Sequence, residues 1–183
     1  MKIKNQQGVG FVEVLVALIL LSIGVLGFSV LQVRAMEASL DASSRIQAMN
    51  LARDLSERMR ANKSGLSKSI PVSADDVEEL IDAYSKAMAG KYSISSHTPA
   101  CKGASKCSSE DFAQEDANEI LYRAYRAGMK VALNECPGSM SLQRYCVYVA
   151  WGETQPIDGS GDTACTNNGS LLSDSKCVVL EAY

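Results

Sequence analysis

The sequence predicts an α+β fold in which a long N-terminal helix packs on a small antiparallel sheet, with additional helices in a disulfide-containing head. Three observations support this prediction. An apolar run near the N-terminus continues into a segment whose apolar residues recur at helical spacing. Two segments with the composition of strands lie near the C-terminus, at residues 144–151 and 176–183. All six cysteines lie beyond Pro99, in the part of the chain that follows the helix.

Residues 9–62 are predicted to form one long helix. Residues 9–33 are predominantly apolar, carry one charged side chain, Glu13, and are long enough to cross a bilayer. Lys2 and Lys4 precede this run, so the positive-inside rule keeps the N-terminus in the cytoplasm. Because an unpaired carboxylate in hydrocarbon costs about 3 kcal/mol, Glu13 needs a partner, and we expect that partner on another molecule.

The helical pattern becomes amphipathic from about residue 34 and is expected to end near Gly65. Charged residues occupy one face, and apolar residues recur at helical spacing on the other. We expect the apolar stripe to lie against the sheet of the head. Its members are Val33, Met36, Leu40, Ile46, Met49, Leu55 and Met59.

The remaining residues, 63–183, are predicted to form the head, and roughly 120 residues suffice for one modest core. Ser73 is a candidate helix N-cap followed by acidic residues in the first turn, which predicts a short helix ending at Gly90. A capping box beginning at Ser108 predicts another helix, which we expect to continue to about Asn134.

Strands are predicted near the C-terminus. Residues 144–151 give the clearest strand and residues 176–183 the second, because both are short and rich in β-branched and aromatic residues. A long polar loop is expected between them, at residues 152–175. A further strand is expected at residues 140–142 or at residues 92–94. The result is a small antiparallel sheet lying on the long helix.

Because the N-terminus is expected in the cytoplasm, the head is expected on the other side of the membrane, where disulfides persist. The six cysteines are therefore predicted to form three disulfides, since their count is even. Fifteen connectivities are possible, and we expect cysteines that are close in sequence to pair. The expected pairs are Cys101–Cys107, Cys136–Cys146 and Cys165–Cys177. A metal site is disfavoured, since there is no Cys-x-x-Cys pair and His97 is the single histidine. No cofactor is expected.

Charge and motifs disfavour several function classes. The formal charge of −3 argues against nucleic-acid binding as the main task, which depends on neutralising phosphates. Residues 158–162 are similar to the first half of a calcium loop, but Thr163 and Gly169 replace the glycine and the acid that such loops need. A plain turn is therefore favoured. No catalytic triad, phosphate loop or paired-acid motif stands out, so an enzyme is not predicted.

The N-terminal segment, in which Gly8 precedes an apolar run that contains Glu13, resembles the class III prepilin signal of type IV pilins and type II secretion pseudopilins. The resemblance implies that a prepilin peptidase cuts after a glycine on the cytoplasmic side and leaves the apolar segment attached. The new N-terminus would be methylated. In this family the fifth mature residue is usually glutamate, and it pairs with the N-terminal ammonium of an adjacent subunit during assembly.

Two glycines compete for the cut. Cleavage after Gly8 makes Val9 the methylated first residue and puts Glu13 fifth. Cleavage after Gly10 makes Phe11 first, the residue type that the family favours, but puts Glu13 third. We favour Gly8, because the position of the glutamate has a role in assembly whereas the aromatic residue is a preference.

Residues 13–18, 21–27 and 50–62 extend the resemblance to minor pilins of the PilV type. The domains that this implies are a prepilin leader (1–8), the transmembrane part of the N-terminal helix (9–33), its amphipathic part (34–62) and a periplasmic globular head (63–183). The chain would reside in the bacterial inner membrane as a single-pass protein and then in the pilus at the cell surface.

The implied function is that of a minor pilin, which primes assembly of the type IV pilus, is incorporated into it, and so supports twitching motility. The implied partners are other minor pilins, the major pilin, the prepilin peptidase and the inner-membrane assembly platform, with a tip adhesin as a further candidate. A minor pseudopilin of a type II secretion system is one alternative. A tip adhesin or DNA-capturing subunit is an alternative of another class, and the acidic charge disfavours DNA capture.

Overall fold

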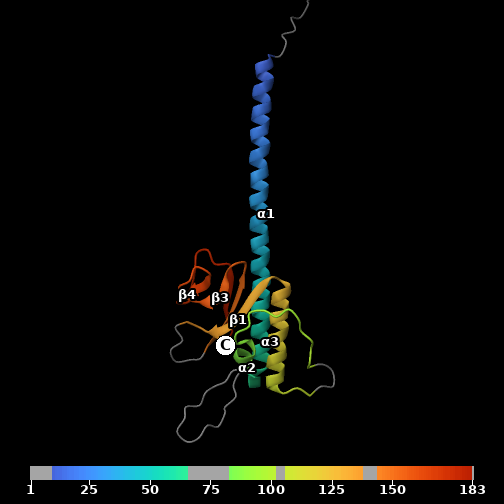
Figure 1. Cartoon of the computed structure of the whole chain (residues 1–183), viewed down its shortest axis with the longest axis vertical. Helices are drawn as coiled ribbons and strands as arrows, with labels where there is room; N and C mark the ends of the chain where they lie inside the picture. Colours follow the sequence, from blue (N-terminus) through green and yellow to red (C-terminus); the bar gives the residue numbers. More distant parts are fainter. Residues whose placement is uncertain (1–9, 66–82, 102–105, 138–143, 183) are drawn as a thin grey trace, which may run out of the picture. The chain divides into compact units, whose positions relative to one another are not determined.

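The computed structural model describes residues 10–65, 83–101, 106–137 and 144–182. It divides into two compact units between Ser43 and Ser44. The longest element, helix α1 (Phe11–Ala61), runs through both units (Figure 1).

In the first unit, the structure describes α1 and the residue before it. Every residue from 10 to 43 is exposed. The hydroxyls of Ser22 and Ser29 donate to the carbonyls of Leu18 and Val25, at 2.8 and 2.9 Å, so the polar side chains within the apolar run are satisfied by their own helix. An 18-residue window of this helix has a mean hydropathy of 2.8. The helix is therefore long and apolar enough to cross a membrane.

The second unit, the head, begins with the last part of α1. The buried residues of this part are Ala48, Leu51, Ala52, Leu55, Ser56 and Met59. A short 3-10 turn (Lys63–Gly65), α2 (Ala83–Met88) and α3 (Ser109–Arg126) complete the helical side of the head. Ser108 caps α3, and its hydroxyl and amide form the predicted capping box with Asp111.

The main sheet consists of β1 (Met129–Glu135), β2 (Tyr145–Trp151) and β6 (Cys177–Glu181), in the order β1-β2-β6 and antiparallel throughout. Its side chains alternate between two faces, as the pleat requires. One face, which includes Val147 and Val149, joins α1, α2 and α3 in the main hydrophobic cluster of the head.

The opposite face of the main sheet is covered by a small layer. It contains β3 (Gln155–Asp158), β4 (Ala164–Asn167) and β5 (Ser170–Leu171), in the order β3-β4-β5. Strands β3 and β4 are parallel although only a short turn separates them, which is unusual because parallel pairs normally need a long crossover. Figure 1 shows β3 and β4 on one side of β1, with α1 and α3 on the other. The head therefore has three layers: helices, main sheet and small sheet.

The α+β class, the long helix and the small antiparallel sheet are confirmed. The predicted strands at residues 144–151 and 176–183 correspond to β2 and β6. The structure also joins the cysteines in the expected pairs, Cys101–Cys107, Cys136–Cys146 and Cys165–Cys177.

The prediction that the helix after Ser108 continues to about Asn134 is wrong. Helix α3 ends at Arg126, and Gly128 follows with φ +68°, a conformation that glycine adopts without a Cβ clash. The following residues form β1 and pair with β2 along their whole length. Their apolar positions fit both helical and strand spacing over so short a run, and the partner strand decides between the two.

The apolar stripe of α1 divides into two parts, contrary to the prediction that all of it lies on the sheet. Leu55 and Met59 are fully buried and Met49 is half-buried. The four earlier members are exposed, with 55% of Val33, 67% of Met36, 68% of Leu40 and 63% of Ile46 accessible. All the buried residues of α1 follow Ser44 and lie in the head.

The loop expected at residues 152–175 contains the three short strands β3, β4 and β5, so that expectation is also wrong. Residues 92–94 form no assigned strand, although the Tyr92 carbonyl accepts from the Val131 amide at 2.7 Å beside β1. The alternative strand at residues 140–142, and the predicted helix start at Ser73, lie outside the described residues.

Candidate functional site on helix α1

Helix α1 begins at the position that sequence analysis singled out. The Gly10 carbonyl accepts from the Glu13 amide at 2.9 Å and from the Val14 amide at 3.4 Å, which closes the first turn. Glu13 lies in that turn, where a negative side chain interacts favourably with the helix dipole. Phe11, the alternative first mature residue, is the first helical residue and is exposed. Gly8 and Val9 lie outside the described residues.

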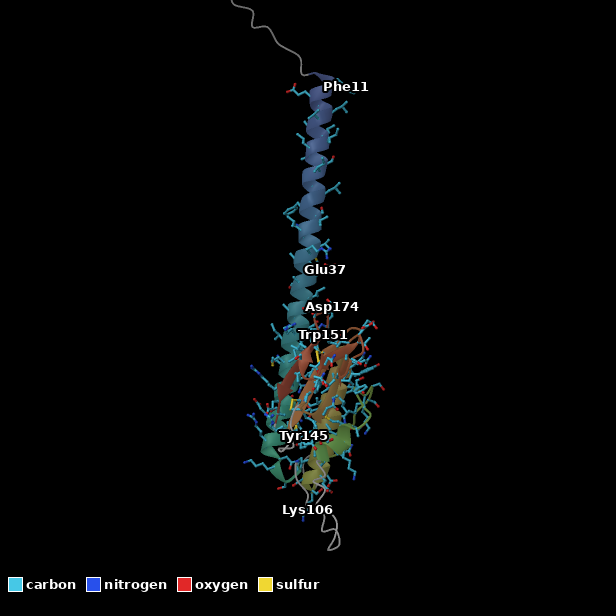
Figure 2. All side chains as sticks on the ribbon, turned by 90° about the vertical axis from the view of Figure 1, so that its left-hand side faces the viewer. Phe11, Glu37, Lys106, Tyr145, Trp151 and Asp174 are labelled. Atoms are coloured by element: carbon cyan, nitrogen blue, oxygen red, sulfur yellow. A yellow bond between two sulfur atoms is a disulfide. The ribbon has the colours of Figure 1, made fainter. Side chains whose placement is uncertain are left out.

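Glu13 is exposed and has no basic side chain within reach on its own helix. The first basic residue of the helix is Arg34, which at 1.5 Å per residue stands about 30 Å away along the axis. The apolar side chains between them project outward all round the helix (Figure 2). Such a surface is stable only against lipid or against other apolar protein surface, since its exposure to water is costly. A carboxylate within it gains most from a cation that another molecule supplies.

The apolar segment ends at a pair of opposite charges. Arg34 donates to Glu37 at 3.1 Å, three residues further along the helix. Both side chains are largely exposed, so this pair contributes little to stability. Leu26, Val30 and Val33 line a shallow apolar groove that ends at this pair.

A second polar cluster lies in the head and joins α1 to α3. Arg58 donates to Asp54 and Asp116 at 2.8 Å and to Glu119 at 2.9 Å. Arg123 also pairs with Asp54. Burial would raise the pKa of Asp54, but the hydrogen bonds and charges of Arg58 and Arg123 outweigh it and hold this pKa below its ordinary value. Despite its burial, Arg58 has a raised pKa because three carboxylates surround it.

This network should make the head less stable in acid. The folded-state pKa of Asp54 lies below its unfolded value of about 3.9. Its contribution is therefore present above about pH 4 and is lost as the pH falls through the folded pKa. We expect Asp54→Asn to lower the free energy of unfolding by about 1 kcal/mol at pH 7, a figure discounted for partial exposure. Below about pH 4 the melting temperature of this variant should fall less steeply than that of the native chain. Glu57→Gln, at an exposed position of the same helix, is the control. Equal acid profiles for the native chain and Asp54→Asn would contradict the assignment.

The other polar residues considered in the sequence have structural partners. The ring of His97 contacts Glu115 through Nε2 at 3.1 Å, and Glu115 also accepts from the Ala100 amide at 3.1 Å. Asp158 accepts from the Thr166 hydroxyl at 2.6 Å and the Gly169 amide at 3.0 Å, and these hydrogen bonds lower its pKa. Over the described ranges, no group of three or more His, Cys, Asp or Glu side chains is placed to hold a metal ion.

Sequence reasoning found Glu13 but not the cluster around Arg58. Two spacings could have indicated it. Asp54 and Arg58 are four residues apart on one helix, and Asp116 and Glu119 are three apart on another. Neither spacing shows that the two helices face each other.

Two family models match this chain. The model described as the type IV pilin Tt1218 matches residues 30–118, just under half of the 183 residues. The prokaryotic N-terminal methylation motif matches residues 3–29, a range that includes Gly8, Gly10 and Glu13. No curated protein and no solved structure matches the chain.

These matches, together with the long apolar helix and the small sheet, support a type IV pilin. Type IV pilins are structural subunits and not enzymes. A prepilin leader implies partners that act in pilus assembly, such as the prepilin peptidase and other pilins. The prepilin signal and the apolar helix also indicate that the chain is anchored in a membrane.

Proposed function

We propose that this chain is a minor pilin, similar to the PilV type, that primes assembly of the type IV pilus and is incorporated into it. The observation that carries the proposal is the exposed apolar stretch of α1, in which Glu13 is the one charged side chain, within a matched N-terminal methylation motif. Exposing such a surface to water is costly. The surface would be buried at all times in a subunit that moves from a bilayer into a filament.

The residue roles follow from this proposal. The prepilin peptidase removes residues 1–8 by cutting after Gly8, and Val9 becomes the methylated N-terminus. Residues 9–33 cross the inner membrane, and residues 63–183 lie in the periplasm, where the three disulfides are stable. Glu13 then pairs with the N-terminal ammonium of an adjacent subunit.

The partners proposed for the chain are other minor pilins, the major pilin and the inner-membrane assembly platform. Pilus biogenesis and twitching motility would depend on these contacts. The support for a minor subunit is the resemblance of residues 13–18, 21–27 and 50–62 to PilV-type minor pilins, together with the cysteine-rich head.

A clean deletion of the gene, complemented at native expression level, tests this proposal. The deletion strain is scored for surface pili, twitching and export of type II secretion substrates. We expect loss of pili with intact secretion, and substoichiometric peptides of this chain in pili purified from the complemented strain. Lost secretion with normal pili would contradict the proposal and indicate a pseudopilin. Normal pili and normal secretion would contradict it in favour of an accessory binding subunit.

A further inference from the structure

The two faces of the main sheet are covered by cores of different chemistry. Among the residues that the structure describes, the cluster on the helical side contains twenty-one buried residues, with large side chains from α1, α2, α3 and the sheet and no cysteine. Within the same described ranges, the cluster on the side of the small layer contains seven buried residues, and four of these are cysteines. The others are two alanines and one tyrosine, Ala132, Ala150 and Tyr148. The helical side therefore buries a large apolar core. The cluster beside the small layer is small and consists mostly of cysteines, although Pro156, Ala164 and Thr166 of that layer are also buried.

The small layer contributes one residue to that second cluster, Cys165 of β4, whose side chain is fully buried. Its disulfide partner, Cys177, begins β6 of the main sheet and is 2% exposed. This bond is the covalent tie between the two layers, because Cys136–Cys146 joins the facing ends of β1 and β2 within the main sheet. Cys101–Cys107 belongs to neither cluster.

Hydrogen bonds also join the two layers. The Lys176 amide donates to the Thr154 hydroxyl at 2.9 Å, and the Asn134 side chain donates to the Pro156 carbonyl at 3.3 Å. Other polar contacts are internal to the layer, since Asp158 accepts from Thr166 and Gly169 within it. These internal contacts shape the layer but do not attach it to the main sheet.

We propose that docking of the β3–β5 layer depends on oxidation of Cys165 and Cys177, whereas the helix–sheet core folds without it. In this step the two thiols lose two protons and two electrons and form the S–S bond. A protein disulfide of a thiol–disulfide oxidant accepts them and becomes a dithiol. Because both sulfurs are buried once the layer is docked, exchange with the oxidant must come before docking. The inference concerns the head alone and does not depend on the pilus role.

The test is hydrogen–deuterium exchange on the full chain in detergent micelles. In the double variant Cys165→Ala/Cys177→Ala, we expect amides of residues 155–171 to lose about 100-fold in protection, the chain-entropy effect for a loop of this length. Amides of α3 and of residues 44–61 should keep theirs. Unchanged protection at 155–171 would overturn the proposal. Loss of protection throughout the head would overturn it as well, because the bond would then hold the whole fold.

Two further double variants separate the covalent tie from packing. Cys136→Ala/Cys146→Ala removes the same atoms from the same cluster but leaves the layers tied, and it should leave residues 155–171 protected. Cys101→Ala/Cys107→Ala, outside the cluster, should also leave them protected. If the Cys136/Cys146 variant exposed the layer as fully as the Cys165/Cys177 variant, the tie would not be the cause and the proposal would fail.

Discussion

Replacing Glu13 with alanine is expected to lower incorporation of this chain into pili by about 100-fold. In the proposed filament its carboxylate pairs with the ammonium at the N-terminus of an adjacent subunit. Removing the carboxylate leaves that ammonium unpaired among apolar side chains, at a cost of about 3 kcal/mol, which corresponds to about 100-fold in an equilibrium. The helix itself should persist, because its first turn is closed by backbone hydrogen bonds from Gly10.

The measurement is quantitative mass spectrometry of head peptides in sheared pili, normalised to the amount of the chain in the inner membrane. Glu13→Gln keeps the side-chain size and removes the charge, so it should fail as alanine does. Glu37→Ala is the matched control, because Glu37 is an exposed acid on the same helix whose partner, Arg34, is also exposed. Native levels of Glu13→Ala in pili would show that this carboxylate has no role in assembly.

The same samples decide the cleavage register. The N-terminal peptide of the mature chain should begin with methylated Val9, which makes Glu13 the fifth residue. A peptide beginning with Phe11 would move the cut to Gly10 and make Glu13 the third residue. In that case Glu13 would lie two residues after the mature N-terminus and not four. The proposed pairing with the ammonium of an adjacent subunit would then need a different axial offset between the two subunits.

Local patterns predicted much of this fold. The long helix, β2, β6 and the capping box at Ser108 were predictable because each is encoded by neighbours in sequence. Strand β1 was missed, since its seven residues fit a helix until β2 is placed beside it. Strands β3 to β5 were missed because two to four residues are too few for a periodic signal.

The sequence predicted one of the two polar sites on α1 and not the other. Glu13 is visible in the sequence as the one charge of an apolar run, whereas the contacts of Arg58 with Asp116 and Glu119 join residues about sixty positions apart. Sequence spacing also could not show where burial along α1 begins. That boundary depends on which residues of the helix pack against the rest of the head, and the first buried residue is Ala48.

This boundary predicts unequal effects for one substitution at two positions of the same helix. Leu55 is fully buried in the main cluster, whereas 68% of Leu40 is exposed. Leu55→Ala removes buried methyl groups and leaves a cavity, so it should lower the free energy of unfolding of the head by about 3 kcal/mol. Leu40→Ala changes a largely exposed side chain and should change this free energy by less than about 0.5 kcal/mol.

Fluorescence of Trp151 during denaturant unfolding of the full chain in detergent measures this difference. Trp151 is the single tryptophan, it is 7% exposed, and it lies in the same cluster as Leu55. Its signal therefore reports the head and not the apolar segment of α1. A destabilisation by Leu40→Ala close to that of Leu55→Ala would mean that Leu40 is packed in the folded chain, contrary to its exposure. If Leu40→Ala leaves the head intact, Val33, Met36, Leu40 and Ile46 remain available to surfaces outside the subunit.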